Sequence, residues 1–275
     1  MKLSIITVNL NNAVGLKKTI CSVINQTFLD IEYIIIDGGS LDGSLEIIKE
    51  YEKKITYWVS EPDSGIYNAM NKGIMHANGE YLQFLNSGDW LVNDSIIEKF
   101  LKETTYCDLL YGNMIMMMPD GKLQVNHGTG GSEITFLTFY FSYMIHPASF
   151  IRRELFYKYG FYDENLKIVS DWKFYLIAFG LNPSKIIYKN IDVTYYDMSG
   201  ISFSQTELAL LERKKVLSEL IPYPILVDLK NIELDLIRLN LIKKYFLTEK
   251  LYNFTQFLLI FLSRLINKMM KLLNK

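Results

Sequence analysis

Apolar residues in the first 90 positions form short unbroken runs that alternate with stretches of helical spacing. The unbroken runs, rich in β-branched residues, predict buried strands at 3–8, 32–36, 56–59 and 81–85. Apolar residues three and four positions apart predict helices at 14–24, 44–51 and 68–76. Strands and helices that alternate through short polar turns are typical of an α/β protein with a parallel sheet.

The pattern becomes mixed after Asp108. A further apolar run predicts a strand at 109–118, before a turn at 119–122 and a loop with three glycines at 128–132. That loop lacks the strand–helix context of a phosphate-binding loop. Helical spacing predicts helices at 150–159 and 170–180, residues 184–196 are expected to be extended, and nearly everything from Gln205 onward has helical spacing.

The composition fits one large domain with a tail, or at most two small domains. The 275 residues are 49% hydrophobic and 21% charged, which is ordinary for a protein with an apolar core. The net charge of −1 gives no indication of a nucleic-acid partner. The charge is unevenly spread, because residues 225–275 carry nine Lys/Arg and four Asp/Glu, a local +5.

The remaining global features predict a cytoplasmic protein. Cys21 and Cys107 are far apart and have no metal-ligand spacing, so we expect reduced thiols. The opening MKLSIITVNLNN becomes polar too early for a signal peptide. No stretch reaches the roughly 18 apolar residues that span a bilayer.

Polar side chains follow the predicted strands at the points where the strands end. They are Asn9, Asp37, Asp63, and the pair Asn86 and Asp89. Turns need polar residues, and that explains any one of them. Several at the same edge of a parallel sheet favour a ligand site, because ligands bind at the carboxyl ends of such strands.

Several blocks in order and spacing give the chain a family likeness. LSIITVNLNN, IIIDGGSLDGS, EPDSGIYNAMNKGIMHANGEYLQFLNSGDWL, HPASFIRRELFYKYGFYDENLKIVSDWKFY and MSGIS resemble the family 2 glycosyltransferases with the GT-A fold. The likeness is to bacterial enzymes of O-antigen, capsule or exopolysaccharide synthesis. It implies an α/β fold with a Rossmann-like, mostly parallel sheet flanked by helices over residues 1–203. Residues 204–275 are then a basic, amphipathic helical extension.

The resemblance implies a site for a nucleotide-diphosphate sugar, with a UDP-sugar as the expected donor. The matching positions are Thr7, Asn9, Asp37, Gly38, Ser40, Asp63, Lys72, Asn86 and Ser87. Asp37 matches the carboxylate that accepts hydrogen bonds from the base, and the glycine lets the backbone approach closely. The alternatives are a turn former at Asp37, a helix start at Asp63 and a solvated lysine at Lys72, which could otherwise pair with a phosphate.

The family's metal-binding pattern is incomplete here. Family members carry Asp-x-Asp at this strand end, where a carboxylate binds a divalent cation that bridges the donor phosphates. The segment 86–89 is Asn-Ser-Gly-Asp, so Asp89 is the one anionic ligand it offers. Asn86 is expected to bond the ribose instead. Mn²⁺ or Mg²⁺ binding is therefore predicted at Asp89, but as weak or dispensable.

The clearest catalytic assignment is Asp171, which occupies the position of the family's base. Inversion needs a base that takes the proton of the acceptor hydroxyl, and the start of a helix favours a charged carboxylate. Trp172 is expected either to stack on the acceptor or to pack in the core. His146, Ser199 and Gly200 match the acceptor and diphosphate loops, although a lone histidine is often only structural.

We therefore expect an inverting glycosyltransferase that acts on a saccharide acceptor carried by a lipid diphosphate. A catalytically impaired nucleotide-binding scaffold of the same fold is the alternative: the missing carboxylates at 86 and 88 argue mildly for it, whereas the presence of Asp171 argues against it. A nucleotidyltransferase is disfavoured because the segment after the first strand is Asn-rich and lacks a basic glycine-rich loop.

The last 25 residues have the pattern of an amphipathic helix. Apolar residues recur at three- and four-residue steps at Leu251, Phe254, Leu258, Leu262, Leu265, Met269 and Leu272. Basic residues surround this stripe at Lys250, Arg264, Lys268, Lys271 and Lys275. The helix is expected to lie on the inner face of the cell membrane as a peripheral anchor. Packing against the catalytic domain or against a second subunit in a homodimer is the alternative.

Overall fold

The computed structural model describes residues 2–118, 120–198, 205–245, 256, 258–260 and 262–264. Two compact units divide between Arg213 and Lys214. This division comes later than the boundary predicted at 203/204, so the first residues of the predicted helical extension belong to the first unit. The first unit contains the sheet and every candidate site residue that the structure describes.

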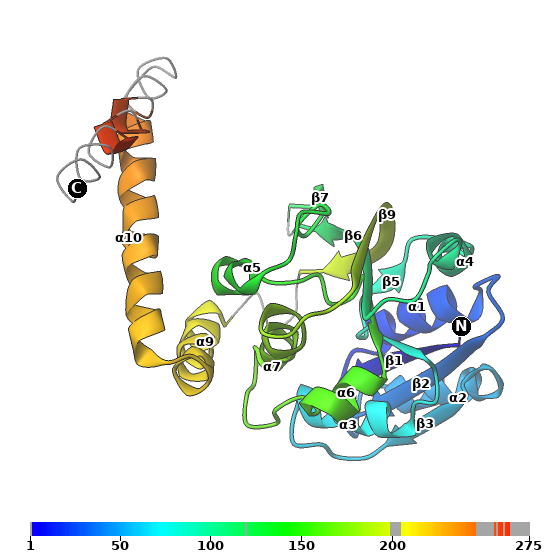
Figure 1. Cartoon of the computed structure of the whole chain (residues 1–275). Helices are drawn as coiled ribbons and strands as arrows, with labels where there is room; N and C mark the ends of the chain where they lie inside the picture. Colours follow the sequence, from blue (N-terminus) through cyan, green and yellow to red (C-terminus); the bar gives the residue numbers. More distant parts are fainter. Residues whose placement is uncertain are drawn as a thin grey trace. The chain divides into compact units, whose positions relative to one another are not determined.

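Within the described residues, nine strands form one sheet (Figure 1). The strand order is β3-β2-β1-β4-β8-β6-β9-β5, and β7 pairs with β6. The strands are β1 Leu3–Asn9, β2 Ile31–Asp37, β3 Tyr57–Ser60, β4 Tyr81–Phe84, β5 Trp90–Leu91, β6 Leu109–Met117, β7 Leu123–Asn126, β8 Ser149–Arg152 and β9 Ile186–Asp197. The first four strands are mutually parallel, as predicted, and β6 and β9 are also parallel.

In the first unit, helices connect the strands and cover the sheet (Figure 1). The described helices of the two units are α1 Ala13–Ile24, α2 Ser44–Glu50, η1 Glu52–Lys54, α3 Ile66–His76, α4 Ile96–Leu101, α5 Phe136–Phe141, α6 Glu154–Tyr159, α7 Ser170–Tyr175, η2 Leu176–Gly180, α9 Thr206–Leu220 and α10 Tyr223–Tyr245. No described helix is long and apolar enough to cross a membrane.

The strand β1 is buried on both faces, which explains its unbroken apolar sequence. Ile5 belongs to a core cluster with Leu16 and Ile20 of α1. Its neighbour Ile6 points to the other face, where it meets Gly73 of α3. α1 and α3 therefore pack on opposite faces of β1. This packing fixes where both helices begin at the edge of the sheet.

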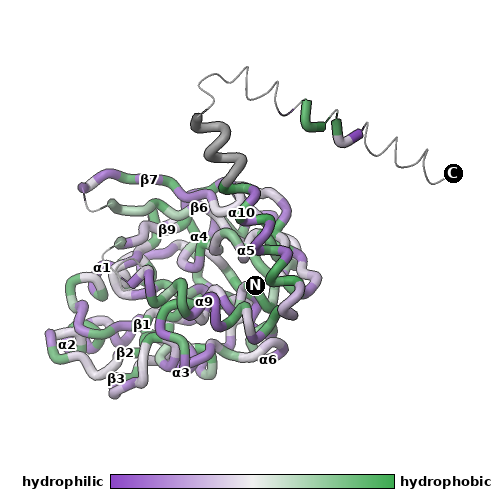
Figure 2. Tube along the Cα trace, turned by 90° about the vertical axis from the view of Figure 1, so that its left-hand side faces the viewer, coloured by the Kyte–Doolittle hydropathy of each residue, from purple (hydrophilic) through white to green (hydrophobic). Residues whose placement is uncertain are grey.

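Some elements differ from those expected. Residues 150–159 were predicted as one helix, but Ser149–Arg152 is a strand that pairs antiparallel with β4 and β6, and only then does α6 begin. A short buried apolar run has the same periodicity in either structure, so spacing alone could not separate them. The β6–β7 hairpin, whose tip is hydrophilic in Figure 2, adds antiparallel pairing, so the sheet is mixed in its second half.

Candidate active site

The carboxyl ends of β1 and β2 bring the predicted residues Asn9, Asp37 and Ser40 together. Asn9 and Asp37 are partners in the strand register. The Asn9 Nδ2 donates to Asp37 Oδ1 over 2.7 Å and lies 3.1 Å from Ser40 Oγ. These three residues form one hydrogen-bonded cluster.

The carboxylate of Asp37 is fully buried and holds the loop that follows β2. Its oxygens accept from the Ser40 hydroxyl and backbone N–H and from the Ser60 hydroxyl, besides Asn9. Burial alone raises the pKa of Asp37, but these hydrogen bonds more than offset it, so the pKa is lowered. Asp37 is therefore a charged acceptor that orders residues 38–40 in the structure as it stands.

Asp63 lies across the same edge, against the Gly38 backbone. A Cβ at Gly38 would lie 2.6 Å from Asp63 Oδ2, so glycine lets the Asp63 carboxylate keep its present position against the backbone. Asp63 Oδ1 accepts from the Gly65 N–H ahead of α3 over 2.9 Å. Lys72, on α3, forms an ion pair with Glu61 at 2.7 Å.

The amide oxygens of Asn9 and Asn86 are buried and have no hydrogen-bond partner within the described residues. Buried polar atoms are normally bonded, so both oxygens are unsatisfied in the structure as it stands. Ser87 lies beside them, and its carbonyl accepts from Asn12 Nδ2. Thr7, by contrast, is fully buried and bonds with Tyr33 inside the core, at 3.1 Å.

The carboxylate of Asp89 is hydrogen-bonded to the backbone of Asp197, an acidic residue that the sequence reasoning did not identify. Its Oδ1 accepts from the Asp197 backbone N–H over 3.0 Å. Burial of Asp89, together with the charge of Asp197, raises the pKa of Asp89 to about 8. Asp197 is the last residue of β9, so the rule that polar residues follow strands would have found it.

Asp89 and Asp197 would each bring a carboxylate, the hard oxygen ligand that Mg²⁺ and Mn²⁺ prefer. Such a cation commonly takes only one or two protein carboxylates and completes its shell with substrate phosphates. No group of three or more His, Cys, Asp or Glu side chains that could hold a metal occurs among the described residues.

Asp171 sits at the start of α7, with its side chain 30% exposed and other side chains directed at it. The Tyr67 hydroxyl, from the first turn of α3, lies 2.9 Å from Asp171 Oδ1. His146 Nδ1 lies 3.9 Å from Asp171 Oδ2. This arrangement leaves an ordered carboxylate that is reachable from solvent.

His146 is buried next to the end of β4, where its ring stacks on Phe84. Its Nε2 lies 2.9 Å from the Tyr162 hydroxyl. Burial lowers the pKa of His146, and the charge of Asp171 only partly opposes this. His146 is therefore a neutral, buried neighbour of Asp171, and its predicted part in the acceptor or diphosphate loop stays a prediction.

Trp172 packs in the core: it is 5% exposed, and its Nε1 donates to the Phe139 carbonyl over 2.9 Å. This geometry agrees with the packing alternative for Trp172. Ser199 and Gly200 lie outside the described residues, so their predicted role remains a prediction. Tyr67 was missed as a site residue although it stands inside the quoted DSGIYNAMN block.

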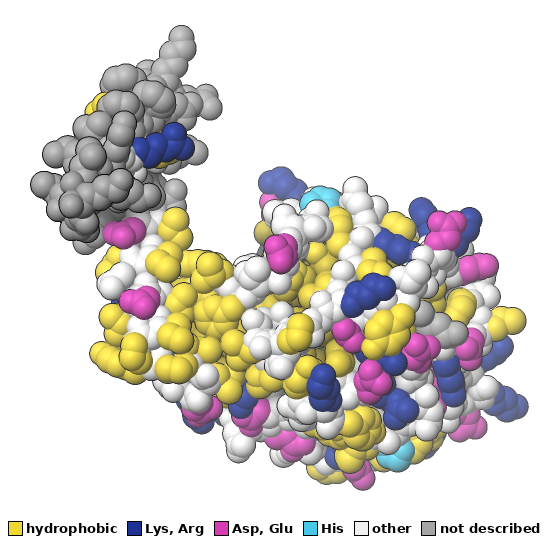
Figure 3. Space-filling view, in the orientation of Figure 1, with side chains coloured by type: hydrophobic (Ala, Val, Ile, Leu, Met, Phe, Trp, Pro, Cys, Tyr) yellow, Lys and Arg dark blue, Asp and Glu magenta, His cyan; other side chains and the backbone are white. Residues whose placement is uncertain are grey.

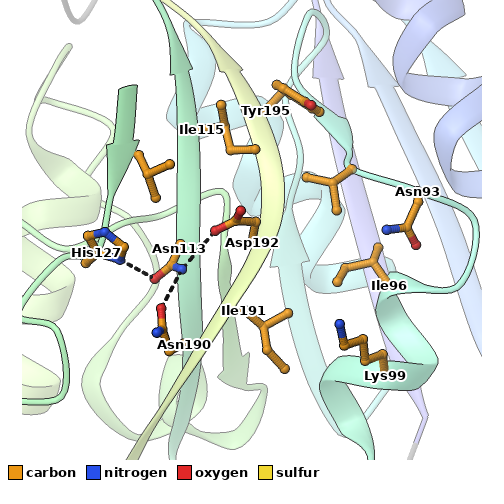
Figure 4. Close-up of a pocket in the computed structure, with 12 residues that line it drawn as sticks. Asn93, Ile96, Lys99, Asn113, Ile115, His127, Asn190, Ile191, Asp192 and Tyr195 are labelled. Carbon is orange, nitrogen blue, oxygen red and sulfur yellow. Dashed lines mark hydrogen bonds between the residues drawn. The ribbon is translucent and has the colours of Figure 1, made fainter. Parts of the chain in front are cut away.

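A cavity of about 670 Å³ lies away from these groups, between α4 and the strands β6, β7 and β9 (Figure 4). Asn113 is central to its polar wall, donating to Asn190 and Asp192 and lying 3.0 Å from His127 Nδ1. None of the predicted site residues lines this cavity.

Two sequence comparisons identify relatives of the chain. The profile of glycosyl transferase family 2 matches residues 4–160. A PGL/p-HBAD biosynthesis glycosyltransferase of Mycobacterium bovis is 31% identical in an alignment 220 positions long, which covers 76% of this chain and 82% of the relative.

Solved structures share the fold. The S. aureus TarS fragment 1–349 in complex with UDP-GlcNAc has a TM-score of 0.62 at 22% identity, over 74% of this chain and 61% of that one. The mannosyltransferase PcManGT from Pyrobaculum calidifontis, in complex with GDP-Man and Mn²⁺, has a TM-score of 0.55 at 13% identity, over 74% and 58%. The chain thus spans about three fifths of these structures. Because the family profile covers more than half of the 275 residues, and a relative above 30% identity aligns over most of both chains, this protein belongs to glycosyl transferase family 2.

Proposed function

We propose that this glycosyltransferase moves one sugar, with inversion, from a nucleoside-diphosphate sugar to a hydroxyl of a lipid-linked saccharide in surface polysaccharide synthesis. The observation that carries the proposal is Asp171, a partly exposed carboxylate that a tyrosine hydroxyl orients from another element. A positioned carboxylate is what the acceptor hydroxyl needs as its base.

The reaction is a single displacement. Asp171 accepts the proton of the acceptor hydroxyl while that oxygen attacks the anomeric carbon from the face opposite the diphosphate. The bond from the anomeric carbon to the phosphate oxygen breaks, and the nucleoside diphosphate leaves with the electron pair. The anomeric configuration of the sugar inverts.

The donor side rests on the strand-end cluster and on the relatives. Asn9, Asn86 and the ordered loop after Asp37 offer amide and backbone groups to a nucleotide. TarS was solved with UDP-GlcNAc and PcManGT with GDP-Man. We expect a UDP-sugar here. Asp89 and Asp197 would hold the divalent cation, which neutralises charge on the departing diphosphate when bound.

A screen with purified protein tests the proposal. UDP-, GDP- and dTDP-sugars are each incubated with a synthetic lipid-diphosphate saccharide, and nucleoside diphosphate release is measured with and without Mn²⁺. We expect turnover with one donor, and NMR of the product to show the inverted anomer. Binding of UDP with no turnover in any combination would instead favour the catalytically impaired scaffold.

Asp171→Asn then tests the base. We expect at least about a 10²-fold loss of turnover, the lower range for removal of a general base, with unchanged UDP affinity in calorimetry. Asp94→Asn, at an exposed carboxylate outside the site, is the control. Near-normal transfer by folded Asp171→Asn protein would refute the assignment.

A further inference from the structure

The backbone just before Asp171 is held by a carboxylate that comes from α9. Glu212 Oε1 accepts from the Lys167 N–H over 2.7 Å, and its Oε2 accepts from the N–H groups of Ile168 and Val169 over 2.9 and 3.2 Å. Glu212 is 8% exposed. One side chain therefore binds three consecutive amides that lead into the base.

These amides have no alternative partner within α7. The helix begins at Ser170, so the N–H groups ahead of it cannot bond to a preceding helical turn. A buried carboxylate is equally costly without hydrogen bonds. Each side satisfies the other, and no other side chain in the described part of the chain bonds these amides. The path of residues 167–169 thus depends on Glu212.

The next residue, Arg213, contacts Trp172, the residue that follows Asp171 in the sequence. Its guanidinium carbon lies 4.5 Å from the centre of the Trp172 ring. Its Nη2 donates to the carbonyl oxygens of Phe139 and Ser142. Two consecutive residues of α9 therefore contact the chain on both sides of the base, at residues 167–169 and at Trp172.

We propose that Glu212 is a positioning residue for Asp171, so that the middle of α9 forms part of the catalytic unit. The inference rests on the proposed function, because it assigns Glu212 a role through the base. Glu212 touches no reacting atom. It acts by fixing the backbone from which the carboxylate projects, and a displacement of about 1 Å in such a group can cost about 10²-fold in rate.

Glu212→Gln tests this role in the full-length chain. The amide keeps the side chain's size but presents an N–H₂ group to at least one backbone N–H, so the segment must shift. We expect kcat to fall about 10- to 100-fold with the donor and acceptor that give turnover in the screen. The Kd for UDP should stay within about twofold, since the nucleotide cluster does not involve α9. Hydrogen exchange of amides 167–169 should accelerate.

Two further variants separate positioning from general damage. Glu212→Asp keeps the charge and should recover part of the lost kcat, and it stands in if Glu212→Gln does not fold. Glu207→Gln, at an exposed position in the first turn of the same helix, is the matched control and should leave kcat and exchange unchanged.

The outcomes distinguish this inference from the proposed function. If Asp171→Asn abolishes transfer while Glu212→Gln retains full kcat despite faster exchange at 167–169, the base stands and the role of Glu212 is refuted. A fall in kcat matched by an equal fall in UDP-binding sites, with no recovery in Glu212→Asp, also refutes it, because that is loss of folded protein. If Asp171→Asn is active, the proposed function itself fails.

Discussion

At the scale of single residues, the Tyr67 hydroxyl is the one group within the described residues that directly hydrogen-bonds the Asp171 carboxylate. Burial, reinforced by the Asp171 charge, raises the pKa of Tyr67 well above its ordinary value, so it remains a donor. The same hydroxyl lies 2.6 Å from the Ile168 carbonyl, one of the residues that Glu212 holds. The orientation of the base is therefore shared between α3 and α9.

Tyr67→Phe should lower kcat about tenfold and leave UDP affinity unchanged. A hydrogen bond to a charged group contributes about 1.5–3 kcal/mol. Part of this free energy holds Asp171 in its orientation, and the variant loses that part. Tyr81→Phe is the control, because Tyr81 is equally buried and its hydroxyl bonds the Cys107 carbonyl, away from the base. Equal effects of the two variants on kcat would show that only packing is at stake.

The predicted binding of a divalent cation also depends on the protonation state of a single residue, Asp89. With the pKa of Asp89 raised to about 8 by burial and by Asp197, the protonated form is favoured at pH 7. A cation must displace that proton, so Mn²⁺ affinity should rise as the pH is raised from about 6 to about 8. It should also be stronger in the presence of UDP, whose phosphates complete the shell.

Calorimetry with Mn²⁺, with and without UDP, measures this. Asp89→Asn should abolish the binding that depends on UDP, whereas Asp94→Asn, at an exposed carboxylate, should retain it. Unchanged Mn²⁺ uptake by Asp89→Asn would place the ion on another group.

At the scale of elements, the distance between α3 and the sheet determines the position of Tyr67. Gly73 lies directly over Ile6 of β1, and a Cβ on Gly73 would overlap Ile6 Cγ2, a branch that cannot swing away. The absence of a side chain lets the helix pack close to the strand and brings its first turn toward Asp171.

Gly73→Ala tests this contact, because the substitution has two opposing effects on the free energy of unfolding. Alanine gains up to about 1 kcal/mol in helix propensity, whereas overpacking a core costs about 1–3 kcal/mol. We expect net destabilisation by about 1–2 kcal/mol in urea unfolding and a lower kcat. Met75→Ala, on the same helix at a position 60% exposed, should change stability by no more than about 0.5 kcal/mol. A gain in stability for Gly73→Ala would mean that the helix is free to move outward.

Elements with unbroken or periodic apolar patterns were predictable, and those defined by pairing were not. β1 and β2 were expected within one or two residues, because two covered faces demand continuous apolar sequence. β5 consists of Trp90 and Leu91 alone and exists through pairing with Tyr195 and Thr194. A two-residue strand has no periodicity, so nothing local indicates it.

The candidate site residues divide in the same way, into those that local patterns mark and those that depend on contacts between distant elements. Asp37, Asp89 and Asp171 could be predicted as site residues because strand ends and family blocks mark them. Glu212 was not, because its role depends on a bond to amides 43–45 residues earlier in the chain, and a glutamate on a helix has no distinguishing spacing. Contacts between distant elements are what local patterns leave out.

At the scale of the whole molecule, the balance of acidic and basic residues differs between the first unit and residues 225–275. Acidic and basic side chains are interspersed over the face of the first unit seen in Figure 3, which gives no basic stripe for a nucleic acid on that face. Residues 225–275 instead carry nine Lys/Arg against four Asp/Glu. Among the described residues of this segment, Leu258, Leu259 and Ile260 are 43%, 55% and 51% exposed.

Exposed apolar residues beside an excess of basic charge suit the surface of an anionic membrane. We therefore expect the full-length protein to co-sediment with vesicles containing phosphatidylglycerol at low salt, and to bind less as salt screens the attraction. Truncation after Tyr245 should release it. Lys268→Gln with Lys271→Gln should weaken binding about 30-fold, since each basic residue near the surface contributes about 1 kcal/mol.

The matched control is Lys53→Gln with Lys54→Gln, which removes the same charge from exposed positions in the first unit and should leave vesicle binding unchanged. Light scattering on the soluble protein supplies the other arm. If the full-length chain does not bind anionic vesicles at low salt, but is a dimer that truncation after Tyr245 converts to a monomer, the apolar stripe is a subunit interface. A lipid-linked acceptor would then have to reach Asp171 without help from this segment.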